Sequence, residues 1–204
     1  MAAPTGLSPG RRRIGLLGGS FNPAHAGHLH ISRQALNRLR LDEVWWLVSP
    51  QNPLKPAAGM ASLEKRLAHA HAVARDRRIR VLDLETRLDT RYTIDTLESL
   101  QFLYPKARFV WLMGADNLAT FARWRRWADI LKAVPVAIFD RPRYSVSGAM
   151  AKVTQRFRHA RIAEHQASRL ADLPPPAWTF VHCPRHPLSA TEIRTRDAGW
   201  INPG

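Results

Sequence analysis

Residues 18–28 combine glycine, serine and histidine in an order that suits the binding of phosphate groups. They read GGSFNPAHAGH and follow a short apolar run, Ile14–Leu17. The two glycines let the backbone approach a ligand closely, and the serine and exposed amides can donate hydrogen bonds to phosphate oxygens. A helix expected to begin near Gly27 directs its positive end at the same place. We therefore predict that this segment binds the phosphates of a nucleotide, through Gly18, Gly19, Ser20 and Phe21.

His25 and His28 are three residues apart, which places them on about the same face at the start of that helix. Two imidazole rings there can donate hydrogen bonds to a polyphosphate and stabilise charge in a transition state. Two other interpretations stay open: a pair of metal ligands, for which no third ligand stands at a suggestive spacing, and a pair of surface histidines. Because the histidines follow a strand and a Gly-Gly turn, we predict the phosphate role.

A second candidate anion site lies near the C-terminus, where residues 188–194 read LSATEIR. Ser189 is a good N-cap for a helix that starts there, and Thr191 lies in its first turn. Their hydroxyls and the free amides can bind an anion, and Arg194 adds a permanent, forked positive charge suited to phosphate. The alternative is an ordinary capped helix with surface arginines.

The composition indicates one globular domain with an excess of positive charge. The chain has 204 residues, of which 45% are hydrophobic, and a formal net charge of +15. This length can bury one core of ordinary size. A basic surface raises the local concentration of anions such as nucleotides, phosphates or nucleic acid. Alternatively, the arginines reflect genome composition and spread over solvated faces, because they form no single long block.

The single cysteine, Cys183, excludes a disulfide within the chain and a zinc cluster built from thiolates. Residues 1–12 have no apolar stretch of signal-peptide length and are predicted to be a disordered leader, followed by a single domain over residues 13–204. No run approaches the roughly 20 apolar residues of a membrane span. We expect a soluble cytoplasmic protein.

Short apolar runs alternate with helical patterns along the chain. This alternation predicts an α/β fold, a Rossmann-like doubly wound parallel sheet of five or six strands with helices on both faces. In such sheets ligands bind beyond the carboxyl ends of the strands, where residues 18–28 begin. The strands are expected at residues 14–17, 44–48, 79–84, 109–113, 134–139 and 179–182, and the helices at 27–39, 62–75, 93–103 and 149–170, with a last one from residue 189.

The segment at residues 18–28 resembles the first signature, G-x-F-x-P-x-H-x-G-H, of the nucleotidyltransferase superfamily that has the HxGH motif. Residues 188–194 resemble the second signature of that superfamily, I-S-S-T-x-I-R. The two motifs lie in the order that the superfamily has, and the resemblance implies that they are two halves of one phosphate site. Asn22 stands where many members have aspartate.

The segments between the two motifs are similar to those of the nicotinate-nucleotide adenylyltransferase family. NPLK at residues 52–55 is similar to its N-P-x-K loop, and TRYTIDTL at residues 90–97 to its S-Y-T-x-D-T-L stretch. GADNLATFARWRRW at residues 114–127 is similar to G-x-D-x-x-x-x-F-x-x-W-x-x-W, and FDRPRY at residues 139–144 to an R-P-x-Y stretch. The resemblance covers residues 14–145 and 179–196.

This resemblance implies a site for nicotinate mononucleotide. Trp124 would stack on the pyridine ring, and backbone amides around Tyr92 and Thr93 would receive the carboxylate. The alternative for Trp124 is that it shares one helix face in the core with Trp127, the role that we expect for Trp127 itself. Asp116 is expected to face the nucleotide, at a ribose hydroxyl or near the metal, or to cap the helix that follows residue 114.

The reaction that the resemblance implies is transfer of AMP from ATP to nicotinate mononucleotide, with Mg²⁺ carried by ATP and pyrophosphate. The residues assigned to the ATP phosphates are His25, His28, Ser20, Ser189, Thr191 and Arg194, and Lys55 is expected to reach the β- or γ-phosphate. Two groups of alternatives stay open. One keeps the fold and changes the substrate, to nicotinamide mononucleotide, phosphopantetheine or a cytidine nucleotide. The other is a basic nucleic-acid-binding module that uses residues 156–169 and the seven tryptophans.

Overall fold

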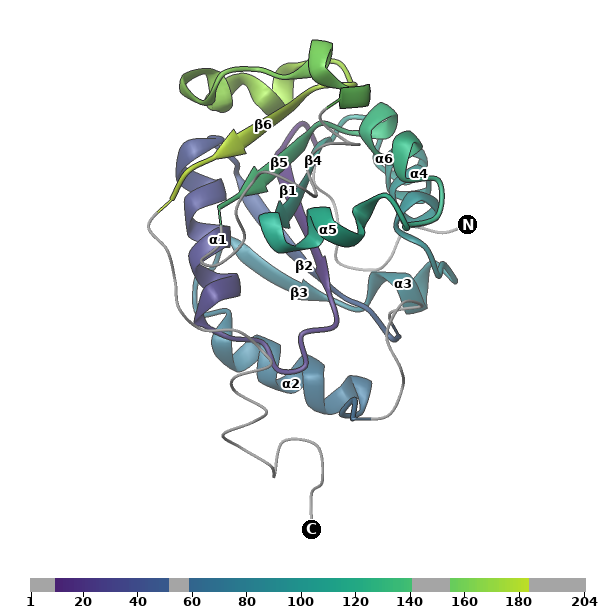
Figure 1. Ribbon diagram of the computed structural model, residues 1–204. Helices are drawn as coiled ribbons and strands as arrows, with labels where there is room; N and C mark the ends of the chain where they lie inside the picture. Colours follow the sequence, from purple (N-terminus) through teal and green to yellow (C-terminus); the bar gives the residue numbers. More distant parts are fainter. Residues whose placement is uncertain (1–9, 52–58, 141–154, 184–204) are drawn as a thin grey trace.

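The computed structural model describes residues 10–51, 59–140 and 155–183. At its centre is a six-stranded sheet with the strand order β3-β2-β1-β4-β5-β6, in which all paired neighbours run parallel (Figure 1). The strands are β1 (Arg13–Gly19), β2 (Glu43–Val48), β3 (Ile79–Leu82), β4 (Arg108–Gly114), β5 (Val136–Phe139) and β6 (Trp178–Val181). The predicted Rossmann-like parallel sheet is confirmed, with six strands.

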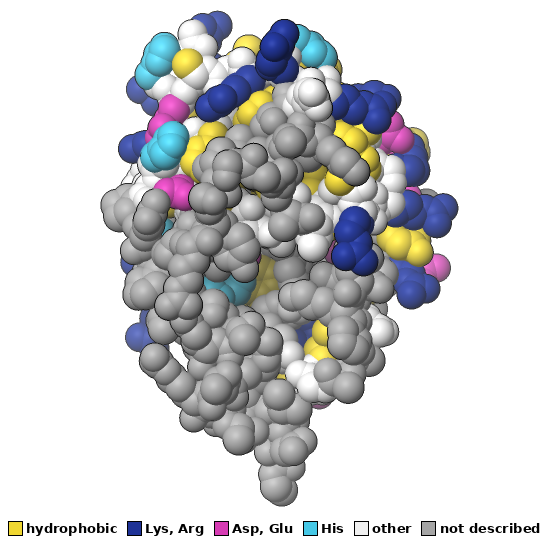
Figure 2. Space-filling model, viewed as in Figure 1, with side chains coloured by type: hydrophobic (Ala, Val, Ile, Leu, Met, Phe, Trp, Pro, Cys, Tyr) yellow, Lys and Arg dark blue, Asp and Glu magenta, His cyan; other side chains and the backbone are white. Residues whose placement is uncertain are grey.

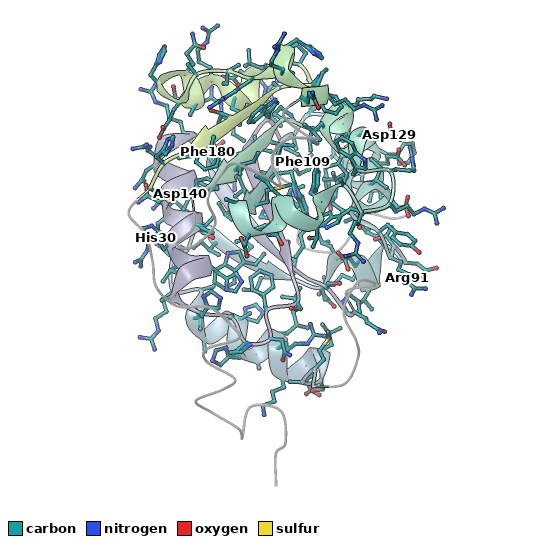
Figure 3. The ribbon with its side chains drawn as sticks, in the orientation of Figure 1. His30, Arg91, Phe109, Asp129, Asp140 and Phe180 are labelled. Carbon is teal, nitrogen blue, oxygen red and sulfur yellow. The ribbon has the colours of Figure 1, made fainter. Side chains whose placement is uncertain are left out.

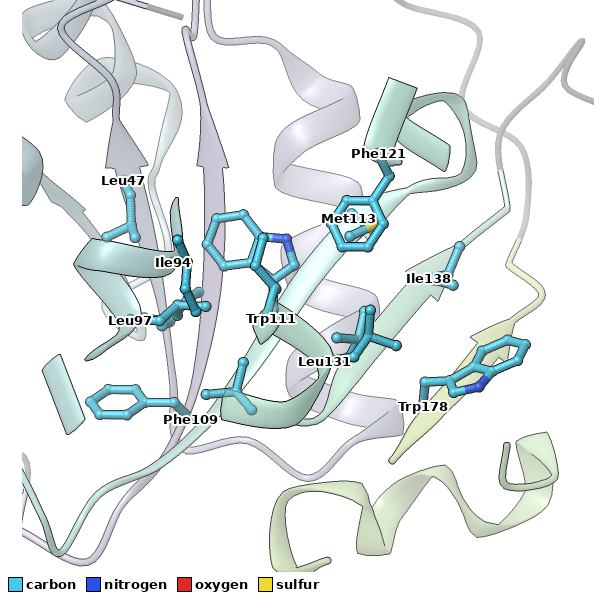
Figure 4. Close-up of a cluster of buried hydrophobic side chains, with 14 of the residues drawn as sticks. Leu47, Ile94, Leu97, Phe109, Trp111, Met113, Phe121, Leu131, Ile138 and Trp178 are labelled. Carbon is cyan, nitrogen blue, oxygen red and sulfur yellow. The ribbon is translucent and has the colours of Figure 1, made fainter. Parts of the chain in front are cut away.

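The strands bury both of their faces because successive side chains point to opposite sides of a sheet. On β4, Phe109, Trp111 and Met113 join one hydrophobic cluster, whereas Val110 and Leu112 join a second cluster on the other face. Figure 4 shows part of the first cluster, where Trp111 lies among side chains from the strands and the covering helices. Burial on both faces explains why the strands appear in the sequence as continuous apolar runs.

Helices cover the two faces of the sheet, as predicted. The cluster around Trp111 includes residues of α3 (Leu84–Arg87), α4 (Thr93–Leu103), α5 (Leu118–Phe121) and α6 (Trp127–Ala133). The opposite cluster includes residues of α1 (Ala26–Arg38), α2 (Leu63–Val73) and the 3-10 helix η3 (Glu164–Asp172). Two further 3-10 turns are η1 (Ala115–Asn117) and η2 (Arg158–Ala160). No helix within these described ranges is long and apolar enough to cross a membrane.

Most predicted elements lie within two residues of their expected ends. The helix predicted at residues 93–103 is α4, and Ser62 caps α2 by accepting a hydrogen bond from the Lys65 amide at 3.2 Å. The third strand ends at Leu82 rather than residue 84, because Leu84 already starts α3. Of the predicted leader, residues 1–9 lie outside the described part of the chain, and Gly10 begins a turn that leads into β1.

The prediction of one basic helix over residues 149–170 is wrong for the part that the structure describes. The chain instead forms η2 and η3, separated by residues 161–163. Arg161 has an extended backbone, with φ −75° and ψ 128°, and forms a parallel bridge with Trp178. The indole N–H of Trp178 also donates to the carbonyl of Phe157 at 2.7 Å. These contacts hold the segment against the edge strand β6, and a continuous helix through Arg161 could not form that bridge.

Part of the arginine excess is used in ion pairs that attach η3 to the sheet. Asp172 pairs with Arg13 at 2.7 Å and with Arg108, so it joins η3 to the beginnings of β1 and β4. Glu164 pairs with Arg38 at the end of α1. Figure 2 shows Lys and Arg side chains spread over the upper and right-hand parts of one face rather than gathered in one block.

Candidate active site

The candidate site lies where the strand order reverses. β1 stands between β2 and β4, and the chain leaves β1 toward one face and β4 toward the other. The crevice between the carboxyl ends of two such strands is where open α/β sheets bind ligands. β1 ends at Gly19, whose carbonyl accepts a hydrogen bond from the Ser49 amide at 2.9 Å. The predicted phosphate-binding segment therefore begins at the expected place.

His25 and His28 cap the N-terminus of α1 reciprocally. Nδ1 of His25 accepts a hydrogen bond from the Gly27 amide at 3.1 Å, and Nδ1 of His28 accepts one from the His25 amide at 3.2 Å. The centroids of the two rings are 3.9 Å apart, so the prediction that the rings share one face is confirmed. His25 is buried and His28 is half-buried. The two side chains thus satisfy backbone donors that the helix itself leaves open.

This cap determines which ring nitrogen carries the proton. A nitrogen that accepts from a backbone N–H must present its lone pair, so both rings, when neutral, carry the proton on Nε2. In this tautomer each ring is a donor through Nε2, and the positive end of the α1 dipole acts in the same region. Within the described ranges no three His, Cys, Asp or Glu side chains gather closely enough to hold a metal ion, and the metal-pair interpretation gains no third ligand there.

The ring of Phe21 packs against His28. Phe21 has a left-handed backbone, with φ 46°, at the turn that follows β1, and its side chain is 1% exposed. Its ring centroid lies 4.6 Å from that of His28 and 5.1 Å from that of Trp46, with which it stacks. The side chain therefore positions the histidine, and only the backbone of Phe21 remains for the predicted phosphate contact.

Arg66 of α2 connects the segments of the site, and it is not among the residues predicted from the sequence. Its guanidinium is buried and donates to four backbone carbonyls at distances between 2.6 and 2.9 Å, those of Ser20, Ser49, Pro50 and Ala61. These carbonyls come from the segments that follow β1 and β2 and from the start of α2. No sequence signal marks this residue, because an arginine on an amphipathic helix is usually exposed.

Asn22 joins the phosphate-binding segment to the chain that precedes α2. Its side-chain amide donates to the Gly59 carbonyl at 3.0 Å, and its Oδ1 accepts from the Ala61 amide at 3.2 Å. A carboxylate cannot donate to a carbonyl. Asparagine therefore suits these contacts at the position where many superfamily members have aspartate.

Trp111 lies against the start of the same segment. A Cβ atom added at Gly18 would come within 2.4 Å of Cη2 of the Trp111 indole, so no larger residue fits there without a shift. The indole is 3% exposed, and it meets Trp124 edge to face, with 6.3 Å between the ring centroids. Trp111 thus connects Gly18 to Trp124. The apolar run at residues 109–113 predicted only that Trp111 lies in a strand, although a glycine and a tryptophan near the ends of two predicted strands were a usable signal.

The structure brings Tyr92, Thr93 and Trp124 to one region. Thr93 is the first residue of α4, and Tyr92 precedes it without forming a side-chain cap. The guanidinium of Arg125 lies 4.7 Å from the centroid of the Tyr92 ring, so the turn that carries Trp124 abuts the start of α4. Trp124 is half-buried and lies between α5 and α6, outside any helix, whereas Trp127 starts α6. The two tryptophans therefore do not share one helix face.

Five predicted site residues remain. The structure describes one of them, Asp116, and the other four lie outside the described part of the chain. Asp116 is half-buried in η1, directly after β4. It is not an N-cap, because Gly114 and Asn117 hold the cap positions of η1 and α5. The predicted residues outside the described part of the chain are Lys55, Ser189, Thr191 and Arg194.

Glu85 of α3 is a titratable group at the edge of the site. Its carboxyl accepts a hydrogen bond from Ser49, the residue whose amide binds the carbonyl of Gly19. Burial raises the pKa of Glu85 to about 7, and the hydrogen bond from Ser49 offsets this effect only in part. The carboxyl is therefore about half protonated at neutral pH.

The contact between Gly18 and Trp111 yields a test of the site's packing. Gly18→Ala is expected to lower the free energy of unfolding by about 1–3 kcal/mol, because the new methyl group overlaps the indole. The smaller ring of Trp111→Phe should restore part of this loss in the double variant, so the two effects are not additive. Urea unfolding of all four proteins measures the coupling, and strictly additive effects would contradict the packing described here.

Glu85 predicts a pH-dependent stability. Because its pKa in the folded state lies above the ordinary value, the folded state binds more protons than the unfolded state between about pH 4.5 and pH 7. The free energy of unfolding should therefore fall across this range relative to that of Glu85→Gln, by up to about 3 kcal/mol, and stay level above it. Urea unfolding of both proteins from acid to neutral pH measures this difference, and a constant difference overturns the assignment.

Comparison with known proteins agrees with this architecture. Residues 16–196 match the model of the cytidylyltransferase-like family. A protein from Methylorubrum extorquens (strain PA1) is 56% identical over 184 residues, which cover 90% of this chain and 100% of the relative. A protein from Parvibaculum lavamentivorans is 52% identical over 194 residues, which cover 95% of this chain and 96% of the relative. Both are named probable nicotinate-nucleotide adenylyltransferase.

Solved structures share the fold. Plasmodium falciparum nicotinic acid mononucleotide adenylyltransferase complexed with APC gives a TM-score of 0.67 at 16% identity, over 90% of this chain and 83% of that one. The same enzyme complexed with NaAD gives a TM-score of 0.69 at 17% identity, with the same coverage. Together with the family match and the close relatives, this shows that the chain belongs to the cytidylyltransferase-like family and, within it, to the nicotinate-nucleotide adenylyltransferases.

Proposed function

We propose that this chain transfers AMP from ATP to nicotinate mononucleotide, giving nicotinate adenine dinucleotide and pyrophosphate. The observation that carries the proposal is the reciprocal cap of His25 and His28 at the N-terminus of α1, beyond the carboxyl end of β1, where the strand order reverses. Relatives that share about half of its residues bear the name of this activity. A solved structure of the same fold is complexed with NaAD.

The phosphates of ATP are assigned to residues 18–28. Backbone amides at the end of β1 and the hydroxyl of Ser20 donate to phosphate oxygens, and Nε2–H of both histidines donates to oxygens whose charge grows during the reaction. Asp116 is assigned to a ribose hydroxyl. Mg²⁺ enters as part of the ATP substrate and leaves with pyrophosphate. From other parts of the chain, the assigned phosphate ligands are Lys55, Ser189, Thr191 and Arg194.

Nicotinate mononucleotide is assigned to the α4 side of the same end of the sheet. The pyridine ring stacks on Trp124, which is half-buried beside Trp111 and Phe121. Its carboxylate binds the first amides of α4, next to Tyr92 and Thr93. Two features support this assignment: α4 has no side-chain cap, and the positive end of a helix dipole favours an anion.

The chemistry needs no general base. The phosphate of nicotinate mononucleotide is mostly dianionic at neutral pH, since its second pKa is near 6. One of its oxygens attacks the α-phosphorus of ATP in line. The bond from that phosphorus to the bridging oxygen breaks, and pyrophosphate leaves with the electron pair. Catalysis consists of positioning and of neutralising the developing charge, without a covalent intermediate.

The proposal is tested by measuring pyrophosphate release from ATP with each acceptor in turn. Nicotinate mononucleotide should be used best, ahead of nicotinamide mononucleotide and phosphopantetheine. Another preferred acceptor would overturn the assignment. So would nucleic-acid binding that depends steeply on salt in a protein that transfers no AMP.

In this assay, the variant His28→Asn separates the proposed catalytic role of His28 from its role in capping α1. The side-chain oxygen of the asparagine can accept a hydrogen bond from the His25 amide, as Nδ1 of His28 does, but the asparagine has no counterpart of the Nε2–H donor. We expect near-native stability and a turnover reduced about a hundredfold or more, as in His28→Ala. Turnover within a few-fold of the unmodified enzyme would remove His28 from the chemistry.

Trp124→Ala tests the pyridine site. Loss of an aromatic stacking partner costs about 1–3 kcal/mol, so the KM for nicotinate mononucleotide should rise at least fivefold while the KM for ATP changes little. Trp127→Ala is the matched control, because Trp127 packs on Phe121 and Phe157 in the core. It should lower stability without this selectivity. Equal weakening of both substrates in Trp124→Ala would make Trp124 a structural residue.

A further inference from the structure

Tyr92, the residue that precedes α4, lies against two arginines. The guanidinium of Arg125 is 4.7 Å from the centroid of the Tyr92 ring, and that of Arg91 is 5.9 Å from it. Both distances are within the range of cation–π attraction, which keeps the charges near the ring. Figure 3 shows Arg91 at the edge of the molecule, beside α3. Two positive charges are thus gathered at the beginning of α4.

Neither arginine has an acidic partner within residues 10–51, 59–140 and 155–183. In this part of the chain Arg91 and Arg125 form no ion pair or hydrogen bond, and each guanidinium lies over the Tyr92 ring. Three acidic side chains of α4 and α6 have a different partner, Arg126. It pairs with Glu98 at 2.7 Å and Asp129 at 3.1 Å, and its Nη1 is 3.9 Å from Asp95 in the first turn of α4. Among the described residues, these three carboxylates are therefore paired with Arg126 and not with Arg91 or Arg125.

Arg91 is also a departure from the stretch that this part of the chain resembles. The S-Y-T-x-D-T-L stretch has serine before the tyrosine, whereas the present chain reads TRYTIDTL and has Arg91 there. Arg125 lies between the two tryptophans of the W-x-x-W stretch, where the pattern leaves the residue open. Both charges are thus additions to the shared motif rather than parts of it.

We propose that Arg91 and Arg125 determine the preference of this enzyme for nicotinate over nicotinamide mononucleotide, by raising the electrostatic potential at the start of α4. This inference rests on the proposed function. The two nucleotides share the ribose, the phosphate and the pyridinium charge, and they differ by a carboxylate against a neutral amide. The electrostatic potential at the position of the pyridine substituent therefore discriminates between the two nucleotides, whereas stacking of the ring on Trp124 does not.

The size of the effect follows from distance and screening. Because each guanidinium contacts the ring of the residue next to Thr93, its charge lies within about one Debye length, ~10 Å at 0.1 M salt, of the first amides of α4. At this separation near a protein surface, one unit charge changes the affinity for a carboxylate about threefold, and two charges about tenfold. Salt should reduce the effect, because both side chains are exposed.

The test compares kcat/KM for nicotinate and nicotinamide mononucleotide in the intact enzyme and in the Arg91→Ser, Arg125→Gln double variant. The ratio of the two values should fall about tenfold in the double variant at 0.1 M salt, and by more at lower salt. Raising the salt should lower the ratio of the unmodified enzyme toward that of the variant, whose own ratio changes little. Arg125→Lys keeps the charge and should keep most of the preference, which a purely structural role of the arginine would not explain.

Arg123→Gln is the matched control. Arg123 is an exposed arginine of the same turn as Arg125, but its guanidinium does not lie over the Tyr92 ring. The ratio in this variant should equal that of the unmodified enzyme. An unchanged ratio in the double variant overturns this inference while leaving the proposed function intact. If the unmodified enzyme does not use nicotinate mononucleotide at all, the proposed function itself has failed, and the two failures are distinguishable.

Discussion

The start of α1 depends on two hydrogen bonds between histidine rings and backbone amides. A helix N-terminus has amides without partners, and serine, threonine, asparagine or aspartate usually satisfies them. Here His25 and His28 satisfy them through Nδ1, each within reach of the other ring. The cap and the tautomer are one arrangement, because the contacts that begin the helix also leave the proton of each neutral ring on Nε2, the atom that the proposed function assigns to phosphate. A cap of aspartate would begin the helix equally well and offer no such donors, because a carboxylate only accepts hydrogen bonds.

Side chains around the histidine cap fix its position relative to the sheet. Arg66 binds carbonyls that follow β1 and β2, and Phe21 packs His28 against Trp46. On the opposite face, Trp111 touches the position of Gly18 and leads to Trp124. The carboxyl end of β1 thus has the histidine cap on one face of the sheet and aromatic rings on the other. The proposed function assigns the polyphosphate to the first of these sides and the flat pyridine ring to the second.

Features with local causes were predictable from the sequence, and features with long-range causes were not. The strands and α4 follow from apolar periodicity, and the phosphate-binding turn follows from its glycines and histidines. The role of Arg66 depends on carbonyls from three separate segments, and that of Trp111 on a glycine in the neighbouring strand. The 3-10 helices after residue 157 arise because Arg161 pairs with Trp178, a contact that no helical pattern contains. Trp124 was predictable only in part. Its motif suggested a role in a site, but its position depends on the turn between α5 and α6.

The most direct test of the central claim is nitrogen NMR of the two histidine rings in protein labelled with ¹⁵N-histidine, with His25→Asn and His28→Asn used to assign the signals. In their neutral form both rings should carry the proton on Nε2, with Nδ1 as the unprotonated acceptor. Addition of ATP should shift the Nε2 signals most strongly and leave the Nδ1 signals in their acceptor range. A proton on Nδ1 of either ring, or Nε2 signals that do not respond to ATP, would contradict the account.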